Sequence, residues 1–452
     1  MRRPRGFQQR GERRIAAALR IALAAALLAV QVLFVVLTTR YLKDHFALIY
    51  GALEGIALIT ALYIYNKPGD LSYRVAWIIP ILFVPVVGLI LYLLWGGDTQ
   101  RKRLQRQTVP KLPPEEPESL RNRSALNADR LQRALPSWSR VSQYLSSRGF
   151  YLYQNTKAVY LPEGALLLED ILGRIKAAER FIFMEYFIIR EGQMWDPILE
   201  ILKKKAASGV EVRLLYDDVG TLQTLPTNYR STLEKAGIRT AIFNPFRPHL
   251  NMAMNYRDHR KITVIDGNIG YCGGLNLADE YINAYEKHGH WKDTAVMLRG
   301  QAVWNLTLMF LMMWQFTTTV EADFDRYRPT MNLPSDGFVQ PFGDSPLDNL
   351  NVSETAYMQI INRAHDYVYI TTPYLILDNE MVTSLINAAQ SGIDVRIITP
   401  HVADKWYVHM VTRSYYAQLI RGGVKIYEYT PGFIHSKMFV SDDQVAIVGT
   451  AN

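Results

Sequence analysis

The sequence contains a single cysteine, Cys272, in 452 residues. One thiol excludes an intramolecular disulfide framework and any zinc site built from several cysteines. The body of the chain also lacks a basic excess, since residues 112–452 hold 34 Lys and Arg against 37 Asp and Glu. Because DNA binding depends on cationic contacts with phosphates, this balance argues against a nucleic-acid partner.

Basic residues and long apolar runs are instead concentrated at the N-terminal end. Residues 1–111 hold 16 Lys and Arg against 5 Asp and Glu, together with apolar runs at 21–37, 46–65 and 75–95. A helix needs about 20 apolar residues to cross a bilayer, and Pro80 and Pro85 would kink the third run. We therefore expect residues 1–97 to form a membrane anchor with two or three transmembrane helices, and the protein to be a multi-pass protein of the cell membrane.

The number of spans and the sidedness stay open. Seven Arg precede Ile21, and residues 96–111 contain five Lys and Arg. Both flanks favour the cytoplasm under the positive-inside rule. Two crossings can satisfy both flanks, whereas three cannot.

The rest of the chain contains an internal repeat. Residues 98–145 are expected to be a polar juxtamembrane linker, 146–320 a first domain, 321–350 an inter-domain linker and 351–452 a second domain. In each domain a helix, an apolar strand, a second helix, a glycine turn and a second apolar strand follow one another, as at 198–218 and 385–401. This alternation indicates parallel βαβ units and thus two duplicated α/β domains.

Both copies end in the pattern H-x-K-x4-D-x6-G-[GT]-x-N with identical spacing. The residues of the pattern are His259, Lys261, Asp266 and Asn276 in the first copy, and His435, Lys437, Asp442 and Asn452 in the second. Each H-x-K segment looks like a strand, so we expect His and Lys on one face. A lysine beside an imidazole suits an anionic phosphate, and two copies related by a pseudo-twofold axis would place two His on opposite sides of one phosphorus.

Such a site can carry out in-line displacement at phosphorus. One neutral imidazole can attack, while the other, protonated, can supply a proton to the leaving oxygen. The two Lys and two Asn would stabilise the anionic oxygens, so that neither a metal nor a cofactor is required.

The paired motifs resemble the phospholipase D superfamily. Residues 255–281 and 432–452 are similar, almost residue by residue, to the two motif blocks of bacterial cardiolipin synthases, and the apolar N-terminal region with NKPGD at 66–70 looks like that family's anchor. The resemblance implies two phospholipase D-like α-β-α domains with pseudo-twofold symmetry. It also implies phosphatidyl transfer between two phosphatidylglycerol molecules, giving cardiolipin and glycerol through a phosphatidyl-histidine intermediate. Phosphatidylglycerol, cardiolipin and the bilayer are then the partners.

The resemblance also implies roles for single residues. His259 is the expected nucleophile and His435 the expected acid, although the pseudo-symmetric motifs leave the reverse assignment open. Asp266 and Asp442 complete the catalytic motifs but are expected to brace them more than to touch phosphate. Asp293 lies where the superfamily places an acidic partner for a catalytic His, and is a candidate supporting residue.

Several alternatives stay open. Hydrolytic phospholipase D and phosphatidylserine synthase share these motifs and differ in the acceptor, and the oligomeric state is not predicted. Because the family pattern continues beyond Asn452, we expect the second domain to be truncated. Residues 303–316 are expected to be a packed helix, with a lipid-facing surface as the alternative. Arg257 and Arg260 could hold a second anionic headgroup.

Overall fold

The computed structural model describes residues 29, 32–33, 36–37, 39–41, 45–67, 71–96, 118–245, 257–345 and 350–451. The chain divides into two compact units. The first comprises residues 1–106 with 249–255, and the second comprises residues 107–248 with 256–452. Most of the apolar run at 21–37, and Asn452, lie outside the described residues.

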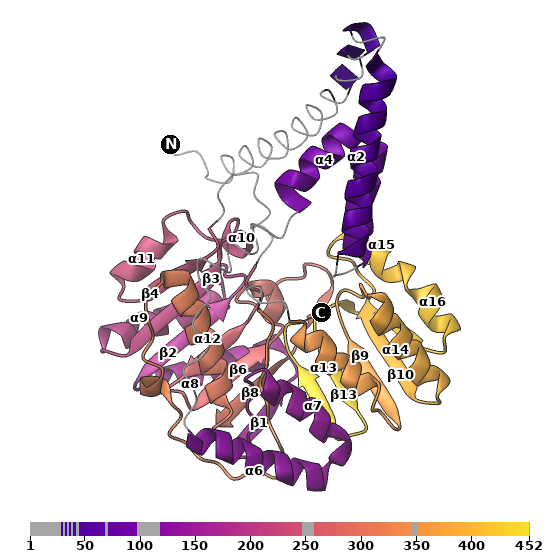
Figure 1. Cartoon of the computed structure of the whole chain (residues 1–452). Coiled ribbons are helices and arrows are strands. Elements are labelled where there is room, and N and C mark those ends of the chain that lie inside the picture. The colour runs from indigo at the N-terminus through magenta and orange to yellow at the C-terminus, as the bar shows by residue number, and fades with distance from the viewer. Residues whose placement is uncertain are drawn as a thin grey trace. The chain divides into compact units, whose positions relative to one another are not determined.

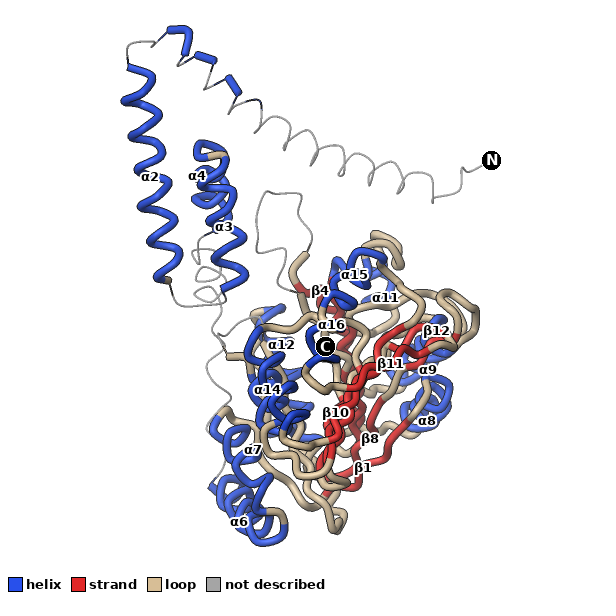
Figure 2. The backbone as a smooth tube through the Cα atoms, turned by 90° about the vertical axis from the view of Figure 1, so that its right-hand side faces the viewer, coloured by secondary structure: helices blue, strands red, loops and turns tan. Residues whose placement is uncertain are grey.

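The first unit contains a long apolar helix packed beside a shorter one. Helix α2 (Phe46–Asn66) includes a 20-residue stretch, Ala47–Asn66, with a mean hydropathy of 1.8. It is the single helix among the described residues that is long and apolar enough to cross a membrane. Helix α3 (Leu71–Phe83) runs back alongside it (Figure 2).

The third apolar run is not one continuous helix. Pro80 stays inside α3, but the helix stops before Pro85, where α4 (Pro85–Leu91) begins and leads into a π-helical turn at Tyr92–Gly96. Val84, the residue before Pro85, has non-helical dihedral angles (φ −136°, ψ 70°), and steric contact with a following proline ring disfavours the helical conformation, which explains the break. A Cβ on Gly88 would lie 2.4 Å from the carbonyl oxygen of Pro80, so that glycine is needed where α4 folds back on α3.

The second unit contains two related sheets. The first has the strand order β1-β8-β6-β5-β2-β3-β4. Its strands are β1 (Thr156–Leu161), β2 (Phe181–Tyr186), β3 (Glu211–Asp217), β4 (Arg239–Phe243), β5 (Ile262–Ile265), β6 (Ile269–Gly273) and β8 (Ala295–Gly300).

The first sheet is mixed rather than parallel throughout. Only β2, β3 and β4 form the expected parallel βαβ units, linked by α9 (Trp195–Ala207), the short α10 (Asp218–Thr221) and α11 (Tyr229–Lys235). Strands β5 and β6 are antiparallel because only three residues join them, and a parallel pair needs a long crossover. The predicted parallel βαβ units are therefore confirmed for β2, β3 and β4, and the antiparallel strands complete the sheet.

The second sheet repeats five of these strands. Its order is β11-β10-β9-β13-β14, matching β4-β3-β2-β5-β6 in order and direction. The strands are β9 (Tyr367–Thr371), β10 (Asp394–Pro400), β11 (Lys425–Tyr429), β13 (Met438–Ser441) and β14 (Val445–Val448), and the helices are α13 (Val352–Ile361), α14 (Asn379–Gln390), α15 (Trp406–Ser414) and α16 (Tyr416–Arg421). The duplication predicted from the sequence is confirmed.

Helices cover both faces of the first sheet. On one face, α8 (Gly164–Lys176) and α9 pack against Ile182 and Met184 of β2. On the other, α12 (Val303–Thr318) packs against Phe181 and Phe183. Most of α12 is buried, so the prediction of a packed helix at 303–316 is confirmed and the lipid-facing alternative is wrong.

Two further features connect the halves of this unit. Helices α6 (Glu118–Ala134) and α7 (Pro136–Ser147) lie within and just beyond the segment expected to be a linker, and α7 packs on α13 (Figure 1). The short strands β7 (His290–Lys292) and β12 (Gly432–Ile434) form a separate parallel ladder. This ladder joins the first half of the unit to the second half, and β12 ends at the residue before His435 of the second motif.

Candidate active site

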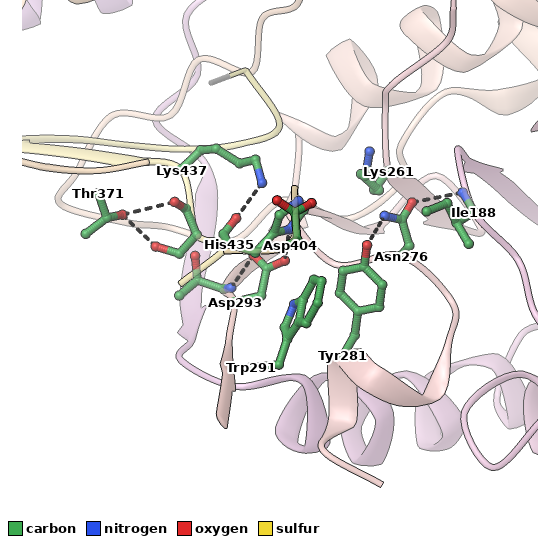
Figure 3. Close-up of polar contacts among 12 residues, drawn as sticks. Ile188, Lys261, Asn276, Tyr281, Trp291, Asp293, Thr371, Asp404, His435 and Lys437 are labelled. Carbon is green, nitrogen blue, oxygen red and sulfur yellow. Dashed lines mark hydrogen bonds and ion pairs between the residues drawn. The ribbon is translucent and has the colours of Figure 1, made fainter. Parts of the chain in front are cut away.

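The β7–β12 ladder places Asp293 beside His435. Ile434 pairs with Lys292, and the backbone N–H of His435 donates to the carbonyl of Lys292 at 2.7 Å. The residues that follow these two, Asp293 and His435, therefore lie side by side. His435 Nδ1 is 2.6 Å from Asp293 Oδ2 (Figure 3). Both side chains are buried, with 6% and 1% of their surfaces exposed. The acidic partner from the first half thus serves the histidine of the second motif.

The backbone around Asp293 orients its carboxylate toward His435. The N–H of Thr294 donates to Asp293 Oδ1 at 2.8 Å, which orients the carboxylate. A Cβ on Gly274 would lie 2.1 Å from the same oxygen. The second glycine of the first motif is therefore required because the carboxylate occupies the space of a side chain.

Aromatic rings enclose His435. The ring centroids of Trp291, Tyr281 and Phe433 lie 5.4, 5.7 and 5.9 Å from that of the imidazole. Tyr281 is held by Asn276, whose Nδ2 donates to the phenol oxygen at 2.6 Å. With Nδ1 facing Asp293, Nε2 is the nitrogen of His435 left to reach a reacting group.

Asn276 lies in the site, but its side-chain amide is hydrogen-bonded to other groups of the protein. Its Oδ1 accepts the backbone N–H of Ile188 at 3.0 Å, and its Nδ2 is bonded to Tyr281. The geometry favours a role in positioning over the direct substrate binding expected from the sequence. The matching Asn452 lies outside the described residues.

His259 has different surroundings. Its ring packs on Phe187 at 5.1 Å between centroids, and it is hydrogen-bonded to the backbone of Thr450, on the second half. Burial, followed by the positive charges of Lys261 and Lys437, holds the pKa of His259 well below its usual value. The imidazole is therefore neutral near pH 7, as a nucleophile must be.

Both motif lysines are buried and turned in the same way. Lys261 Nζ donates to the carbonyl of His259 at 2.6 Å, and Lys437 makes the equivalent bond to His435. Each is 2% exposed. Burial lowers the pKa of Lys437 to about 7, and burial and the charge of Lys437 lower that of Lys261 well below its usual value. A bound anion would relieve this unfavourable concentration of positive charge.

The His435–Asp293 pair responds to the same charges. Burial raises the pKa of Asp293 to about 7, against the opposing effect of Lys437. Burial and the two lysines lower the pKa of His435 well below its usual range. A phosphodiester between the lysines would offset their charges and let His435 hold a proton against Asp293.

The motif aspartates lie away from these groups. Asp266 accepts the backbone N–H groups of residues 179–181 at 2.7–2.9 Å, and Asp442 accepts those of residues 365–367 at 2.9–3.0 Å. Five residues of extended chain separate each from its lysine, about 16 Å. The geometry does not support counting Asp266 and Asp442 among the catalytic residues. The geometry favours a structural role, in which Asp266 stabilises the turn before β2 and Asp442 stabilises the turn before β9.

The H-x-K segments precede strands β5 and β13 rather than lying within them. The middle residue of each is held by the adjacent central strand. Arg260 Nη1 lies 3.7 Å from Glu185 Oε1 at the end of β2, while Ser436 Oγ lies 2.6 Å from Thr371 Oγ1 at the end of β9. Glu185 and Thr371 occupy matching register positions, opposite Ile262 and Met438. The first half therefore has an arginine beside a buried carboxyl group, whose pKa burial and Asp258 raise well above its usual value, where the second half has two hydroxyls.

The two arginines beside the first motif are engaged within the protein. Arg260 also donates to the carbonyls of Met309 and Asp344, at 3.3 and 2.8 Å. Arg257 donates to the carbonyl of Asn244 at 2.9 Å. These contacts do not favour the expected role in holding a second headgroup.

A cavity of about 760 Å³ opens beside the first motif. His259, Arg260 and Lys261 line it together with apolar side chains that include Leu306, Met309 and Phe342.

Several contributors to the site were not predicted from the sequence. Asp404 accepts the phenol O–H of Tyr374 at 2.6 Å and lies beside His435 and Lys437 (Figure 3). Tyr281, Trp291 and Glu185 were also missed. Asp404 has no counterpart in the repeated pattern, so no signal in the sequence identifies it. Trp291, in contrast, lies two residues before Asp293, so it could have been identified together with that aspartate.

A duplicated mixed α/β fold that brings two H-x-K segments into one site is that of a phospholipase D-like protein. A family model described as "Cardiolipin synthase, PLD-like domain" matches residues 171–296 and 357–452, and one described as "Phospholipase_D-nuclease N-terminal" matches residues 55–97. The chain belongs to the cardiolipin synthase family of these proteins.

Curated relatives agree with this assignment. The chain is 35% identical to a cardiolipin synthase of Halalkalibacterium halodurans, over 93% of this chain and 85% of that protein. It is 44% identical to an uncharacterised protein of Streptococcus mutans, over 87% and 85% of the two chains. Among solved structures, phosphatidylserine synthase of Haemophilus influenzae is similar with a TM-score of 0.46 and 13% identity, over 68% of this chain and 80% of that one.

Proposed function

We propose that this protein is a membrane-bound phosphatidyltransferase that converts two phosphatidylglycerol molecules into cardiolipin and glycerol. The carrying observation is a single buried site that combines two differently equipped histidines. One is neutral and free of a carboxylate partner in the described part of the chain, and the other is paired with Asp293 at 2.6 Å. Cardiolipin synthases among the relatives support the choice of substrate.

In the first step, the phosphate of one phosphatidylglycerol binds between Lys261 and Lys437. His259 attacks phosphorus, a P–N bond forms, and the bond from phosphorus to the glycerol headgroup oxygen breaks. His435 gives its Nε2 proton to the departing oxygen. The negative charge of Asp293 stabilises the imidazolium before this transfer and fixes the ring orientation.

In the second step, the roles of His435 reverse. The neutral imidazole takes the proton from the terminal hydroxyl of a second phosphatidylglycerol while that oxygen attacks phosphorus. The P–N bond breaks, His259 is restored and cardiolipin leaves. The two buried lysines supply positive charge to the phosphoryl oxygens in both steps.

The N-terminal unit anchors the enzyme in the bilayer through two or three membrane segments. The apolar helix α2 and the match of residues 55–97 to the N-terminal family model support the anchor. Helices α3 and α4 together carry the third apolar run, and the run at 21–37 would supply the remaining segment.

The direct test supplies phosphatidylglycerol vesicles to the purified full-length protein and follows products. Free glycerol formed in equal amounts with cardiolipin supports the proposal. Glycerol with phosphatidic acid would indicate a hydrolase, and incorporation of added serine would indicate a phosphatidylserine synthase. His259→Ala, which removes the attacking nitrogen, is the control and should release no glycerol.

A further inference from the structure

Helix α15 lies on the outside of the second domain (Figure 1), and several of its apolar side chains are exposed. Trp406, Tyr407 and Met410 are 72%, 56% and 64% exposed, and Val411 is 41% exposed. At about 100° per residue these four positions fall within an arc of roughly 140°. They form one continuous stripe, which we call the α15 stripe.

The opposite side of the helix is anchored. Thr412 is buried, and its hydroxyl accepts the backbone N–H of Leu375 at 3.1 Å. The stripe is therefore a fixed outward face rather than the loose end of a helix. Scattered exposed apolar residues need no explanation, but a Trp, a Tyr and a Met gathered on one fixed face do.

The stripe adjoins the active site. Trp406 follows Asp404 by two residues, a span of at most about 7 Å. Asp404 lies beside His435 and Lys437 and is bonded to Tyr374 (Figure 3). The stripe therefore begins two residues from a side chain that lies beside His435 and Lys437.

The charges around the stripe have a definite sign. Lys405 and Arg413 are each 50% exposed, whereas their carboxylate partners, Asp404 and Glu428, are 17% and 21% exposed. The groups that reach outward are thus mainly cationic. A Trp- and Tyr-rich face with outward cations matches an anionic lipid surface.

We propose that the α15 stripe docks on the surface of the bilayer and holds the active site at the level of the lipid phosphates. This inference rests on the proposed function, in which the substrate stays embedded by its acyl chains. The headgroup layer is only about 5–8 Å thick on each side of a bilayer. A site that receives a lipid phosphate without extracting the lipid must therefore lie against that layer, and interfacial helices insert to a similar depth.

A depth measurement tests the docking itself. The full-length protein with Cys272→Ser and Met410→Cys is labelled with an environment-sensitive fluorophore and reconstituted in phosphatidylglycerol–phosphatidylcholine vesicles carrying doxyl-lipids. The matched control is Leu126→Cys on α6, another helix position that is 60% exposed. We expect doxyl-lipids to quench the Met410 label and leave the Leu126 label unchanged. Equal quenching at both positions, or quenching of the Met410 label that depends on protein density instead of doxyl-lipid, would overturn the proposal.

An activity measurement tests its consequence. The double variant Trp406→Ser with Met410→Ser should release glycerol from bilayer phosphatidylglycerol at least roughly tenfold more slowly, but act within about twofold of wild type on short-chain monomeric phosphatidylglycerol. Leu126→Ser should affect neither rate. Equal loss on both substrates would refute the docking role. If the wild type releases glycerol from neither bilayer nor monomeric phosphatidylglycerol, the proposed function fails. The quenching result still shows whether the α15 stripe docks on the bilayer.

Discussion

Replacing Asp293 by Asn tests the division of labour between the two histidines. The amide is isosteric, and its oxygen can still accept the Thr294 N–H that now binds Oδ1 at 2.8 Å. Its NH2 group would then face His435 Nδ1 in place of the carboxylate at 2.6 Å. The substitution therefore removes a buried negative charge and forces the histidine into the opposite tautomer, with little change in volume.

The expected size of the effect follows from that contact. A hydrogen bond to a charged group contributes about 1.5–3 kcal/mol, and each 1.36 kcal/mol of barrier is tenfold in rate. Glycerol release from phosphatidylglycerol should therefore slow by roughly 10- to 150-fold in kcat. A phosphatidyl ester with a good leaving group needs no proton at departure, so its first step should slow much less.

Two comparisons make the result interpretable. Asp404→Asn removes a nearby carboxylate that is bonded to Tyr374, and should slow glycerol release less than Asp293→Asn does. Thermal unfolding midpoints of both variants check that the fold is intact. The reasoning would be refuted if Asp293→Asn kept more than about a third of the wild-type kcat, or if it slowed both substrates equally.

Three further predictions concern the rest of the site. Arg260→Ser should remove the hydrogen bonds to the Met309 and Asp344 carbonyls and the positive charge beside buried Glu185, and should destabilise the protein by roughly 2 kcal/mol. Adding Glu185→Thr, which installs the hydroxyl pair of the second half, should restore at least part of the thermal midpoint, and a double variant no more stable than the single one would count against the pairing. Because burial, Lys261 and Lys437 hold the pKa of His259 low, the acid limb of kcat/KM should lie well below pH 6.5, and Lys437→Gln should move that limb to higher pH; an unmoved limb would show that another group titrates. Excess EDTA should leave glycerol release unchanged, because two lysines supply the positive charge; loss that one divalent ion restores would contradict this.

The sequence predicted the components of the site better than their connections. Identical spacing in the two motifs predicted that His259, Lys261, His435 and Lys437 act together, and the structure gathers them. Asp293 was identified as a supporting acid, but its partner depends on pairing between β7 and β12, which are only three residues long and about 140 positions apart in the chain. Strands this short have no recognisable pattern, so their pairing is visible only in three dimensions.

The same limit explains the other differences. The apolar segments of β2, β3 and β5 look alike in sequence; the three-residue turn after β5 shows that β5 and β6 are antiparallel, but the antiparallel pairing of β5 with β2 is visible only in the structure. Asp266 and Asp442 share the motif spacing with the histidines, yet the rise of the strand carries them to the opposite end. Spacing alone does not distinguish a residue needed for the chemistry from one needed for the turn.

The central claim is that His259 forms the bond to phosphorus while His435 only moves protons. The most direct test incubates the His435→Asn variant with a phosphatidyl ester carrying a good leaving group, quenches in alkali and maps the modified peptide. A phosphoramidate is stable to alkali and labile to acid, which distinguishes it from a serine ester. We expect the adduct on His259 and none in the His259→Asn variant. An adduct on His435 would reverse the assignment, and the absence of any adduct would contradict the covalent mechanism.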